Sequence, residues 1–443
     1  MSDTPAAVVD HAAALARRIA THTARLTIIG QGYVGLPLAI AFARAGFQVA
    51  GLDSDLDRVT ALATGRSHVP DVPSEELQAQ IRAGRYQATT ETAVLADSDA
   101  IIICVPTPLG KSKDPDISYV IAASKDAAAR FHPGKLIILE STTYPGTTEE
   151  LLLPLFEAKG GTVGEDLFLA FSPERIDPGN PSFKVGDIPK IVGGTTEACR
   201  RLAASLYREI VPHVHEVSTP KVAELAKLYE NVFRNVNIAL ANEFSVMCRY
   251  LGVDSREVID AAATKPFGFM PFYPGPGIGG HCIPVDPLYL SWKMRLNGYQ
   301  ARFISLADDI NRSMPAHVLT LVAEALNDCG LPFKGARVLV LGVAYKRGIG
   351  DTRESPAFEI IAALRRKGSE VTYADPHVPA LWVDGARIKA VEATEEELRA
   401  ADCVLVLTDH PEFDYAAVAR HVRLIVDTRH TVPDAARGRL VRL

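Results

Sequence analysis

The chain has 443 residues, of which 47% are hydrophobic and 23% are charged, and its formal net charge at pH 7 is -6. This length predicts two or three globular domains, and the mildly acidic balance argues against nucleic acid as a partner. No apolar run reaches the length of a membrane span, so we expect no membrane partner either.

The cysteines and the first residues indicate the compartment. Six cysteines are scattered along the chain, without a Cys-x-x-Cys pair or the spacing of a metal site. We therefore expect free thiols, no bound metal and a reducing compartment, the cytoplasm. Residues 1–24 are rich in alanine and lack the apolar stretch of a secretory signal, which predicts a helical N-terminal extension.

The first motif is a glycine-rich turn. A short apolar strand at residues 26–29 runs into Gly30-Gln-Gly-Tyr-Val-Gly35, and a helix at 38–45 and a strand at 48–52 follow, ending at Asp53. This order is the signature of a dinucleotide-binding unit, although the glycines alone could mark a structural turn. Asp53 would bond the ribose hydroxyls and repel a 2′-phosphate, which favours NAD over NADP.

Three more apolar strands follow, at residues 99–105, 135–140 and 168–171. Polar residues and prolines come directly after each of them. In an open parallel sheet, ligands bind at the carboxyl ends of the strands. The polar side chains there are therefore candidates for the reacting end of the cofactor: Thr107, Thr142 and Glu174. The threonines could instead cap helices, and Glu174 could be a capping glutamate or a general base.

Residues 221–251 predict one long helix without internal glycine or proline. Its apolar positions are spread round the circumference, which predicts burial on several sides and a contact between two copies of the chain. Lys227 and Asn231 lie four residues apart and share a face. In so apolar a helix we expect them to point into a cleft rather than into solvent.

The central loop, residues 272–287, reads Phe-Tyr-Pro-Gly-Pro-Gly-Ile-Gly-Gly-His-Cys-Ile-Pro-Val-Asp-Pro. Glycines let a backbone approach a ligand closely. Cys282 is either a reactive thiol or a small buried hydrophobe. Neighbouring side chains on an extended chain point apart, so we do not expect His281 to form a dyad with Cys282.

The last part of the chain again shows the alternation of strands and helices seen at its beginning. After a helical region at residues 308–328, strands and a helix alternate again and predict a smaller parallel sheet: strands at 336–342, 371–375, 403–408 and 424–427, with a helix at 358–366. This last part contains no Gly-x-Gly-x-x-Gly. Lys346 and Arg353, near the ends of strands, fit a ligand with phosphates, whereas Arg347 reads as a surface charge.

These parts together predict a chemistry. Oxidation of an alcohol by hydride transfer needs a base but no cysteine. If the aldehyde is held and oxidised again, the Cys282 thiolate adds to it, a second hydride leaves and water hydrolyses the thioester. Lys227 and Asn231 would stabilise the oxyanions, and Glu174 and Asp286 would orient or activate water. Two NAD would be consumed per turnover.

Five motifs occur in one order along the chain: Gly30-Gln-Gly-Tyr-Val-Gly-Leu-Pro37, Cys104-Val-Pro-Thr-Pro108, Ser172-Pro-Glu-Arg175, Gly279-Gly-His-Cys282 and Gly350-Asp-Thr-Arg-Glu-Ser-Pro356. In them the chain resembles the UDP-glucose/GDP-mannose dehydrogenase family, the nucleotide-sugar 6-dehydrogenases. The resemblance implies an α/β fold of two Rossmann-like parallel-sheet domains joined by a central helical domain. The expected divisions are an extension at 1–24, an NAD-binding domain at 25–214, a helical dimerisation domain with the cysteine loop at 215–329, and a UDP-sugar-binding domain at 330–443.

The resemblance also implies roles for individual residues. Cys282 would be the nucleophile, helped by Glu174, Lys227, Asn231, Asp286 and Thr142. NAD would contact Gly30, Gly32, Tyr33, Val34, Gly35, Asp53, Arg58, Thr107, Thr142 and Arg353. The UDP-sugar substrate would contact Glu174, Arg175, Lys227, Asn231, Tyr273, Gly279 and Lys346. The family implies a homodimer through the long helix, or a larger homo-oligomer.

Substrate choice rests on finer resemblances. Residues 172–180, 264–269, 272–276 and 282–287 are similar to the branch that oxidises UDP-N-acetylglucosamine. The UDP-glucose branch usually has lysine three residues after the cysteine, where this chain has Val285. UDP-N-acetylmannosamine remains the close alternative, because both N-acetyl branches share Gly-Gly-His-Cys. Two further hypotheses are a catalytically silent nucleotide-sugar-binding protein and a two-electron 3-hydroxyacid dehydrogenase, which would not explain residues 330–443.

Overall fold

The computed structural model describes residues 10–110, 114–175 and 187–443. The chain divides into two compact units, Met1–Tyr229 and Glu230–Leu443. Helix α8 (Pro220–Leu251) begins in the first unit and ends in the second. The expectations that fall on residues 1–9 and 176–180 lie outside the described residues.

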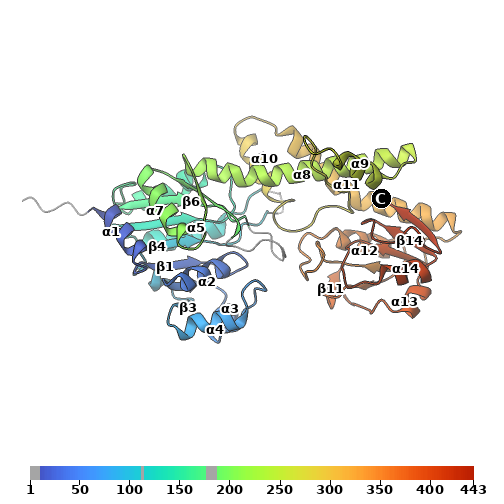
Figure 1. The fold of residues 1–443 in the computed structure, drawn as a ribbon, viewed down its shortest axis with the longest axis horizontal. Helices are drawn as coiled ribbons and strands as arrows, with labels where there is room; N and C mark the ends of the chain where they lie inside the picture. Colours follow the sequence, from blue (N-terminus) through green and yellow to red (C-terminus); the bar gives the residue numbers. More distant parts are fainter. Residues whose placement is uncertain (1–9, 111–113, 176–186) are drawn as a thin grey trace, which may run out of the picture. The chain divides into compact units, whose positions relative to one another are not determined.

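The first unit is an α/β domain around one sheet (Figure 1). Its elements before α8 are α1 (His11–Ala20), β1 (Arg25–Ile29), α2 (Gly35–Ala45), β2 (Gln48–Leu52), α3 (Leu56–Ala63), α4 (Ser74–Arg82), β3 (Tyr86–Thr89), the 3-10 turn η1 (Thr92–Leu95), β4 (Ala100–Ile103), α5 (Ser118–Ala129), β5 (Lys135–Leu139), the π-helical turn η2 (Thr148–Leu152), α6 (Leu153–Glu157), β6 (Leu167–Phe171), β7 (Lys190–Gly194), α7 (Glu197–Arg208) and β8 (Val214–Val217). The strand order is β3-β2-β1-β4-β5-β6-β7-β8. All neighbours are parallel except β6 and β7, which are antiparallel.

Alternation along the strands builds a core on each face of this sheet. Ile102 and Ile138 pack on one face with helices α1, α2 and α7, whereas Ile101 and Ile137 pack on the other with α5 and α6. Successive strand residues point to opposite faces, so a strand covered on both sides is apolar throughout. This explains why the expected strands read as continuous apolar runs.

The second unit contains the rest of α8, a helical region and a smaller sheet. Its elements are α9 (Ser255–Ala263), α10 (Asp286–Leu296), α11 (Arg302–Asp328), β9 (Arg337–Leu341), α12 (Pro356–Arg366), β10 (Glu370–Ala374), β11 (Ala380–Val383), β12 (Ala386–Lys389), α13 (Glu395–Ala400), β13 (Cys403–Val406), α14 (Tyr415–His421), β14 (Leu424–Asp427) and β15 (Arg439–Arg442). The sheet β10-β9-β13-β14-β15 is parallel throughout. The expected fold class, two parallel-sheet domains and a helical region with one long helix, is confirmed.

Several details differ from the expectations. The helix expected at residues 308–328 begins earlier, at Arg302, and contains Pro315. The hairpin of β11 and β12 and the edge strand β15 were not expected. Helix α1 packs into the core of the first unit through Leu15 and Ile19, so the described part of the N-terminal extension belongs to that unit. In the part of the chain that the structure describes, no helix is both long and apolar enough to cross a bilayer.

Helix α8 is buried along one side in the single chain, so the expected burial on several sides depends on the expected contact with a second copy and stays a prediction. Large apolar side chains remain exposed in the single chain, among them Tyr229, Phe233, Leu240, Met247 and Tyr250. The described residues of this chain do not cover these apolar side chains.

One buried carboxylate ties α8 to the loop after β5. Glu224 is 1% exposed. Its Oε1 accepts hydrogen bonds from Thr148 N at 3.0 Å and Thr148 Oγ1 at 2.8 Å, and its Oε2 accepts one from Gly146 N at 2.5 Å. Burial raises the pKa of Glu224, although these hydrogen bonds oppose the shift.

We expect Glu224→Ala to lower the free energy of unfolding by about 2–4 kcal/mol, because it leaves two buried N–H groups without an acceptor. Glu243→Ala is the matched control, since Glu243 is exposed on the same helix, and surface changes usually stay within about 0.5 kcal/mol. Chemical denaturation of both variants measures the difference. Equal losses in the two variants would contradict the anchoring role of Glu224.

Candidate active site

The glycine-rich turn joins β1 to α2 in the first unit. A Cβ on Gly30, which has φ 92°, would lie 2.5 Å from the carbonyl oxygen of Cys104, and one on Gly35 would lie 1.8 Å from the carbonyl oxygen of Gly30. A Cβ on Gly32 would meet no described atom within 4 Å. The outer glycines therefore close the turn, and the space beside Gly32 is open.

The start of α2 lies directly after this space. Val34 precedes the helix, and no described side chain caps it. Tyr33 is exposed. The backbone N–H groups at this helix N-terminus lie next to the open space beside Gly32, where a pyrophosphate group would fit. The turn therefore suits the phosphates of a dinucleotide.

Asp53 lies at the carboxyl end of β2, beside the turn. Its Oδ2 accepts hydrogen bonds from Gln31 N at 2.7 Å and Arg58 Nη1 at 2.9 Å, and its Oδ1 accepts one from Asp55 N at 3.0 Å. The structure thus brings together Asp53 and Arg58, two of the residues expected to contact NAD. Because Asp53 is also held by the turn itself, its carboxylate has a defined position.

Thr107, Thr142 and Glu174 follow β4, β5 and β6, which are neighbours in the sheet. The two threonines are partly buried. Glu174 accepts hydrogen bonds from Arg175 N at 2.7 Å and from Lys190 Nζ at 3.0 Å. Sequence reasoning missed both Lys190 and its second partner, Glu140. For Glu140 a signal was visible, because it is a charged residue directly after an apolar strand.

Lys227 and Asn231 are both buried, at 7% and 4% exposure, as expected for a pair on one face of α8. Asn231 belongs to the second unit, where its Nδ2 donates to Asp286 Oδ2 at 2.6 Å. Asp286 opens helix α10, and its N–H donates to the carbonyl oxygen of Cys282 at 2.8 Å. Cys282 is partly exposed, one helical turn before α10. Negative charge is favoured near a helix N-terminus, which suits a thiolate at this place.

Three buried asparagines that the sequence reasoning missed hold the central loop. Asn235 Nδ2 donates to the carbonyl oxygen of Ile283 at 3.1 Å. Asn242 Oδ1 accepts from Gly275 N at 2.9 Å, and Asn242 Nδ2 donates to Asn311 Oδ1 at 2.9 Å. Asn231, Asn235 and Asn242 lie on helix α8 and Asn311 lies on α11. The repeated asparagines of α8 were a visible pattern in the sequence.

The expected phosphate-binding residues lie in the loop between β9 and α12. Arg353 Nη2 donates to Asp351 Oδ2 at 2.6 Å, and the Arg353 carbonyl oxygen accepts from Gly280 N at 2.8 Å. Burial alone would raise the pKa of Asp351, but Arg353 lowers it. Lys346 is partly buried in the same loop.

Two expected substrate contacts have defined surroundings. A Cβ on Gly279 would lie 2.5 Å from the Cβ of Tyr345, so only glycine fits there. The Tyr273 hydroxyl donates to Asp260 Oδ1 at 2.6 Å, and the Arg256 guanidinium lies 4.4 Å from the centroid of the Tyr273 ring. Tyr273 is therefore tied to helix α9 in this structure.

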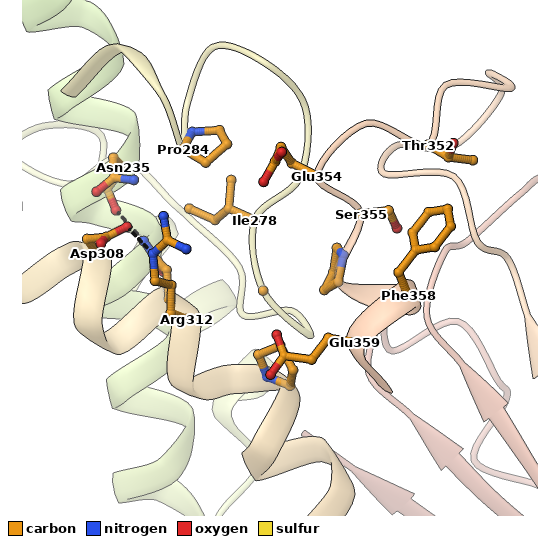
Figure 2. A pocket seen from close by; sticks show the side chains of 14 residues that line it. Asn235, Ile278, Pro284, Asp308, Arg312, Thr352, Glu354, Ser355, Phe358 and Glu359 are labelled. Carbon is orange, nitrogen blue, oxygen red and sulfur yellow. Dashed lines mark hydrogen bonds and ion pairs between the residues drawn. The ribbon is translucent and has the colours of Figure 1, made fainter. Parts of the chain in front are cut away.

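A cavity of about 410 Å³ lies in the second unit, beside the central loop. Figure 2 shows the side chains around it. It is lined by Asn235, Gly277, Ile278, Pro284, Asp308, Asn311, Arg312, Pro315, Thr352, Glu354, Ser355, Pro356, Phe358 and Glu359. Arg312 Nε donates to Asp308 Oδ1 at 2.7 Å inside it. None of the expected site residues lines this cavity.

Among the residues that the structure describes, one group of side chains has the composition of a metal site: His377, His410 and Glu412. Both ring nitrogens of His410 are engaged, because Nδ1 lies 3.1 Å from Gly348 N and Nε2 lies 3.1 Å from Asp375 Oδ2. Nδ1 accepts the Gly348 N–H, so Nε2 carries the proton and donates it to Asp375. The ring has no lone pair left for a metal.

The models of three domains of one family match the chain. They are the NAD-binding domain of the UDP-glucose/GDP-mannose dehydrogenase family at residues 24–211, its central domain at 221–313 and its UDP-binding domain at 339–434. The cofactor expected from the glycine turn, NAD, agrees with the first match.

Individual relatives cover most of the chain. A UDP-N-acetyl-D-mannosamine dehydrogenase of Pyrococcus horikoshii is 35% identical over 427 residues, 94% of this chain and 98% of the relative. A UDP-N-acetyl-D-glucosamine 6-dehydrogenase of Pseudomonas aeruginosa is 37% identical over 358 residues, 80% of this chain and 83% of the relative. The solved structure of the UDP-D-ManNAc dehydrogenase of Pyrococcus horikoshii has a TM-score of 0.86 at 34% identity, covering 94% of this chain and 98% of its own.

We expect Asp53→Ala to weaken NAD binding about tenfold or more, because a charge-assisted hydrogen bond to the ribose contributes about 1.5–3 kcal/mol. NADP binding should weaken less, since the variant also removes the repulsion of a 2′-phosphate. Titration calorimetry measures both affinities, with Asp57→Ala, an exposed acid on α3, as the control. Unchanged NAD affinity in Asp53→Ala would contradict the ribose assignment.

Proposed function

The chain belongs to the UDP-glucose/GDP-mannose dehydrogenase family, and from this premise we propose that it oxidises the C6 hydroxyl of UDP-N-acetylglucosamine to a carboxylate. Its matches to the NAD-binding and UDP-binding domain models make it an NAD-dependent UDP-sugar dehydrogenase. The carbon that is oxidised, the sugar and the use of Cys282 are the parts we propose.

The observation that carries the proposal is the surroundings of Cys282. The thiol precedes a helix N-terminus, and the carbonyl of its own residue is held by the N–H of Asp286. The Asp286 carboxylate is in turn held by Asn231. A partly exposed cysteine just before a helix N-terminus is suited to covalent chemistry, whereas a structural cysteine needs only apolar neighbours.

The proposed reaction has two oxidation steps. In the first, the C6 alcohol gives a hydride to one NAD and a proton to a base, which leaves the aldehyde. The Cys282 thiolate then adds to the aldehyde carbon, and the resulting thiohemiacetal gives a second hydride to a second NAD. Water hydrolyses the thioester, releasing the carboxylate and restoring the thiol. The sum is one alcohol, one water and two NAD to one carboxylate, two NADH and three protons.

The remaining expected residues support these steps. In the proposal, Lys227 and Asn231 donate to the oxygen that becomes negative when the thiolate adds. Glu174 and Asp286 orient or activate the hydrolytic water, assisted by Thr142. All of these residues are present and buried or partly buried, which argues against the alternative of a silent binding protein.

Two observations bear on the sugar. The Pseudomonas aeruginosa relative is named for UDP-N-acetyl-D-glucosamine, and Val285 stands where the UDP-glucose branch usually has lysine. The Pyrococcus horikoshii relative is named for UDP-N-acetyl-D-mannosamine and covers more of this chain. The mannosamine epimer is therefore the second candidate, and UDP-glucose the third.

The exposed apolar side chains of α8 support a homodimer. Phe233, Leu240 and Met247 are spaced seven residues apart and are 40%, 59% and 47% exposed. A seven-residue apolar repeat forms a seam along a helix that packs against another helix. We propose that a second copy covers this seam. The six free cysteines fit the proposed cytoplasmic location.

We expect the wild-type protein to form two NADH per UDP-N-acetylglucosamine consumed, and Cys282→Ser to form the free acid at least about a hundredfold more slowly, because a hydroxyl is a poor nucleophile here. Cys329→Ser, at an exposed thiol, is the control. Absorbance of NADH and chromatography of the sugar product measure both quantities. One NADH with release of aldehyde would contradict the four-electron reaction, and turnover with only the epimer or UDP-glucose would contradict the sugar assignment.

Charges placed in the α8 seam should separate a dimer. We expect Leu240→Glu with Met247→Glu to sediment as a monomer where the wild type sediments as a dimer, because buried unpaired carboxylates are costly. Trp382→Glu changes an exposed aromatic residue on β11, outside the seam, and should leave the dimer intact. A dimer of unchanged affinity in the double variant would contradict this interface.

A further inference from the structure

A buried cation lies at the carboxyl edge of the first sheet, beside Glu174. Lys190 is the first residue of β7 and is 4% exposed. Its ammonium forms ion pairs with Glu140, directly after β5, and with Glu174 Oε2 at 3.0 Å. Three charged side chains from three neighbouring strands therefore meet in one buried cluster.

The reversed direction of β7 explains how Lys190 reaches this edge. In the antiparallel pair, Ala170 lies opposite Gly194 and Phe171 opposite Gly193. Continuing that register places Glu174 opposite Lys190. In a parallel β7 the first residue would lie at the other edge, away from the ends of β5 and β6. The single antiparallel pair thus brings a lysine to the edge where ligands bind.

The cluster is anchored on its inner side. The Tyr207 hydroxyl, on α7, donates to Glu140 Oε2 at 2.7 Å, and Lys190 Nζ lies 5.2 Å from the centroid of the Tyr207 ring. Cys104, at the end of β4, also faces the cluster, and burial raises the pKa of its thiol, which keeps it neutral. The groups around Lys190 therefore leave one cation between two carboxylates.

The two carboxylates differ in access. The Glu140 side chain is 0% exposed, whereas that of Glu174 is 12% exposed. Glu174 Oε1 also accepts the N–H of Arg175 at 2.7 Å, and Arg175 Nη1 donates to the carbonyl oxygen of Pro189, next to Lys190. Glu174 can therefore reach a ligand while Lys190 and the Arg175 N–H hold its carboxylate in place. Glu140 cannot reach a ligand, because its side chain is fully buried.

The charges favour an ionised Glu174. Burial alone would lower the pKa of Lys190, but Glu140 and Glu174 raise it, so the ammonium stays charged. Burial raises the pKa of Glu140 to about 7, with Lys190 opposing the shift. Burial therefore disfavours the ionised form of the fully buried Glu140, whereas Glu174 is partly exposed and keeps its ion pair with the Lys190 ammonium.

We propose that Lys190 is a positioning residue for the reaction: its ammonium, anchored by Glu140 and Tyr207, keeps the Glu174 carboxylate ionised and aimed at the water that it activates. The inference rests on the proposed function, in which Glu174 acts on that water. Lys190 itself touches neither the sugar nor the cofactor in this proposal.

The test uses charge-matched variants. Lys190→Met alone would leave two buried carboxylates without a cation and destabilise the domain. Glu140→Gln combined with Lys190→Met removes one charge of each sign, so Glu174 remains as the only charged member. Glu140→Gln alone and Lys190→Arg, which keeps the cation, are the controls. Thermal unfolding confirms that each variant is folded.

We expect the double variant to lose at least about tenfold in kcat, with the KM values for NAD and UDP-N-acetylglucosamine nearly unchanged. The acid limb of its kcat-pH profile should move up by about one pH unit or more, because Glu174 no longer has a cation beside it. Glu140→Gln and Lys190→Arg should show no upward shift. A wild-type profile in the double variant, or a fall in kcat without a shift, would overturn the proposal, since a merely structural role predicts the latter.

A second measurement separates this inference from the proposed function. Wild-type NADH formation tests the function. Infrared titration of the protonated carboxyl band, assigned with Glu174→Gln, tests the inference without turnover. We expect a higher titration midpoint in the double variant than in Glu140→Gln. Equal midpoints overturn the role of Lys190 even in an active enzyme, whereas a raised midpoint in a protein that oxidises no UDP-sugar means that only the proposed function fails.

Discussion

A charge taken out of water must meet an opposite charge or hydrogen-bond donors, or it destabilises the fold. This constraint shapes the candidate site in both units. In the first, Lys190 lies between Glu140 and Glu174. In the second, the buried Asp286 carboxylate accepts from Asn231. Each proposed catalytic carboxylate is therefore already paired before a ligand binds, and its position is set by its partner.

The sheet topology supplies these partners at the edge where they are needed. Parallel strands bring their carboxyl ends to one edge, so residues that are distant in sequence, such as Thr107, Thr142 and Glu174, follow neighbouring strands. The antiparallel β7 adds the beginning of a strand to the same edge. Helix α8 contributes Lys227 to one unit and Asn231 to the other, one helical turn apart. The backbone thus determines which residue types meet.

Much of this arrangement could be predicted from sequence, and the exceptions have physical reasons. Gly30, Gly35 and Asp53 were predictable because a tight turn and a ribose contact impose local requirements on the backbone. Lys190 was not, because its place depends on the direction of a strand that no local pattern encodes. The amides of Asn235 and Asn242 were missed because asparagine in a helix usually faces solvent. The exposed seam of α8 fits the expected contact between two copies, which stays a prediction because an apolar pattern shows that burial is needed, not which molecule provides it. The domain divisions and residue roles stay predictions.

The central claim is that Cys282 carries the substrate covalently between the two oxidations. Rapid quenching of a single turnover, with Glu174→Gln used to slow hydrolysis, followed by mass spectrometry of the peptide that contains Cys282, tests it directly. The account predicts an acyl adduct of the UDP-sugar on that peptide, which appears with the second NADH and disappears as the free acid forms. Formation of the acid at the same rate with no adduct on Cys282 would contradict it.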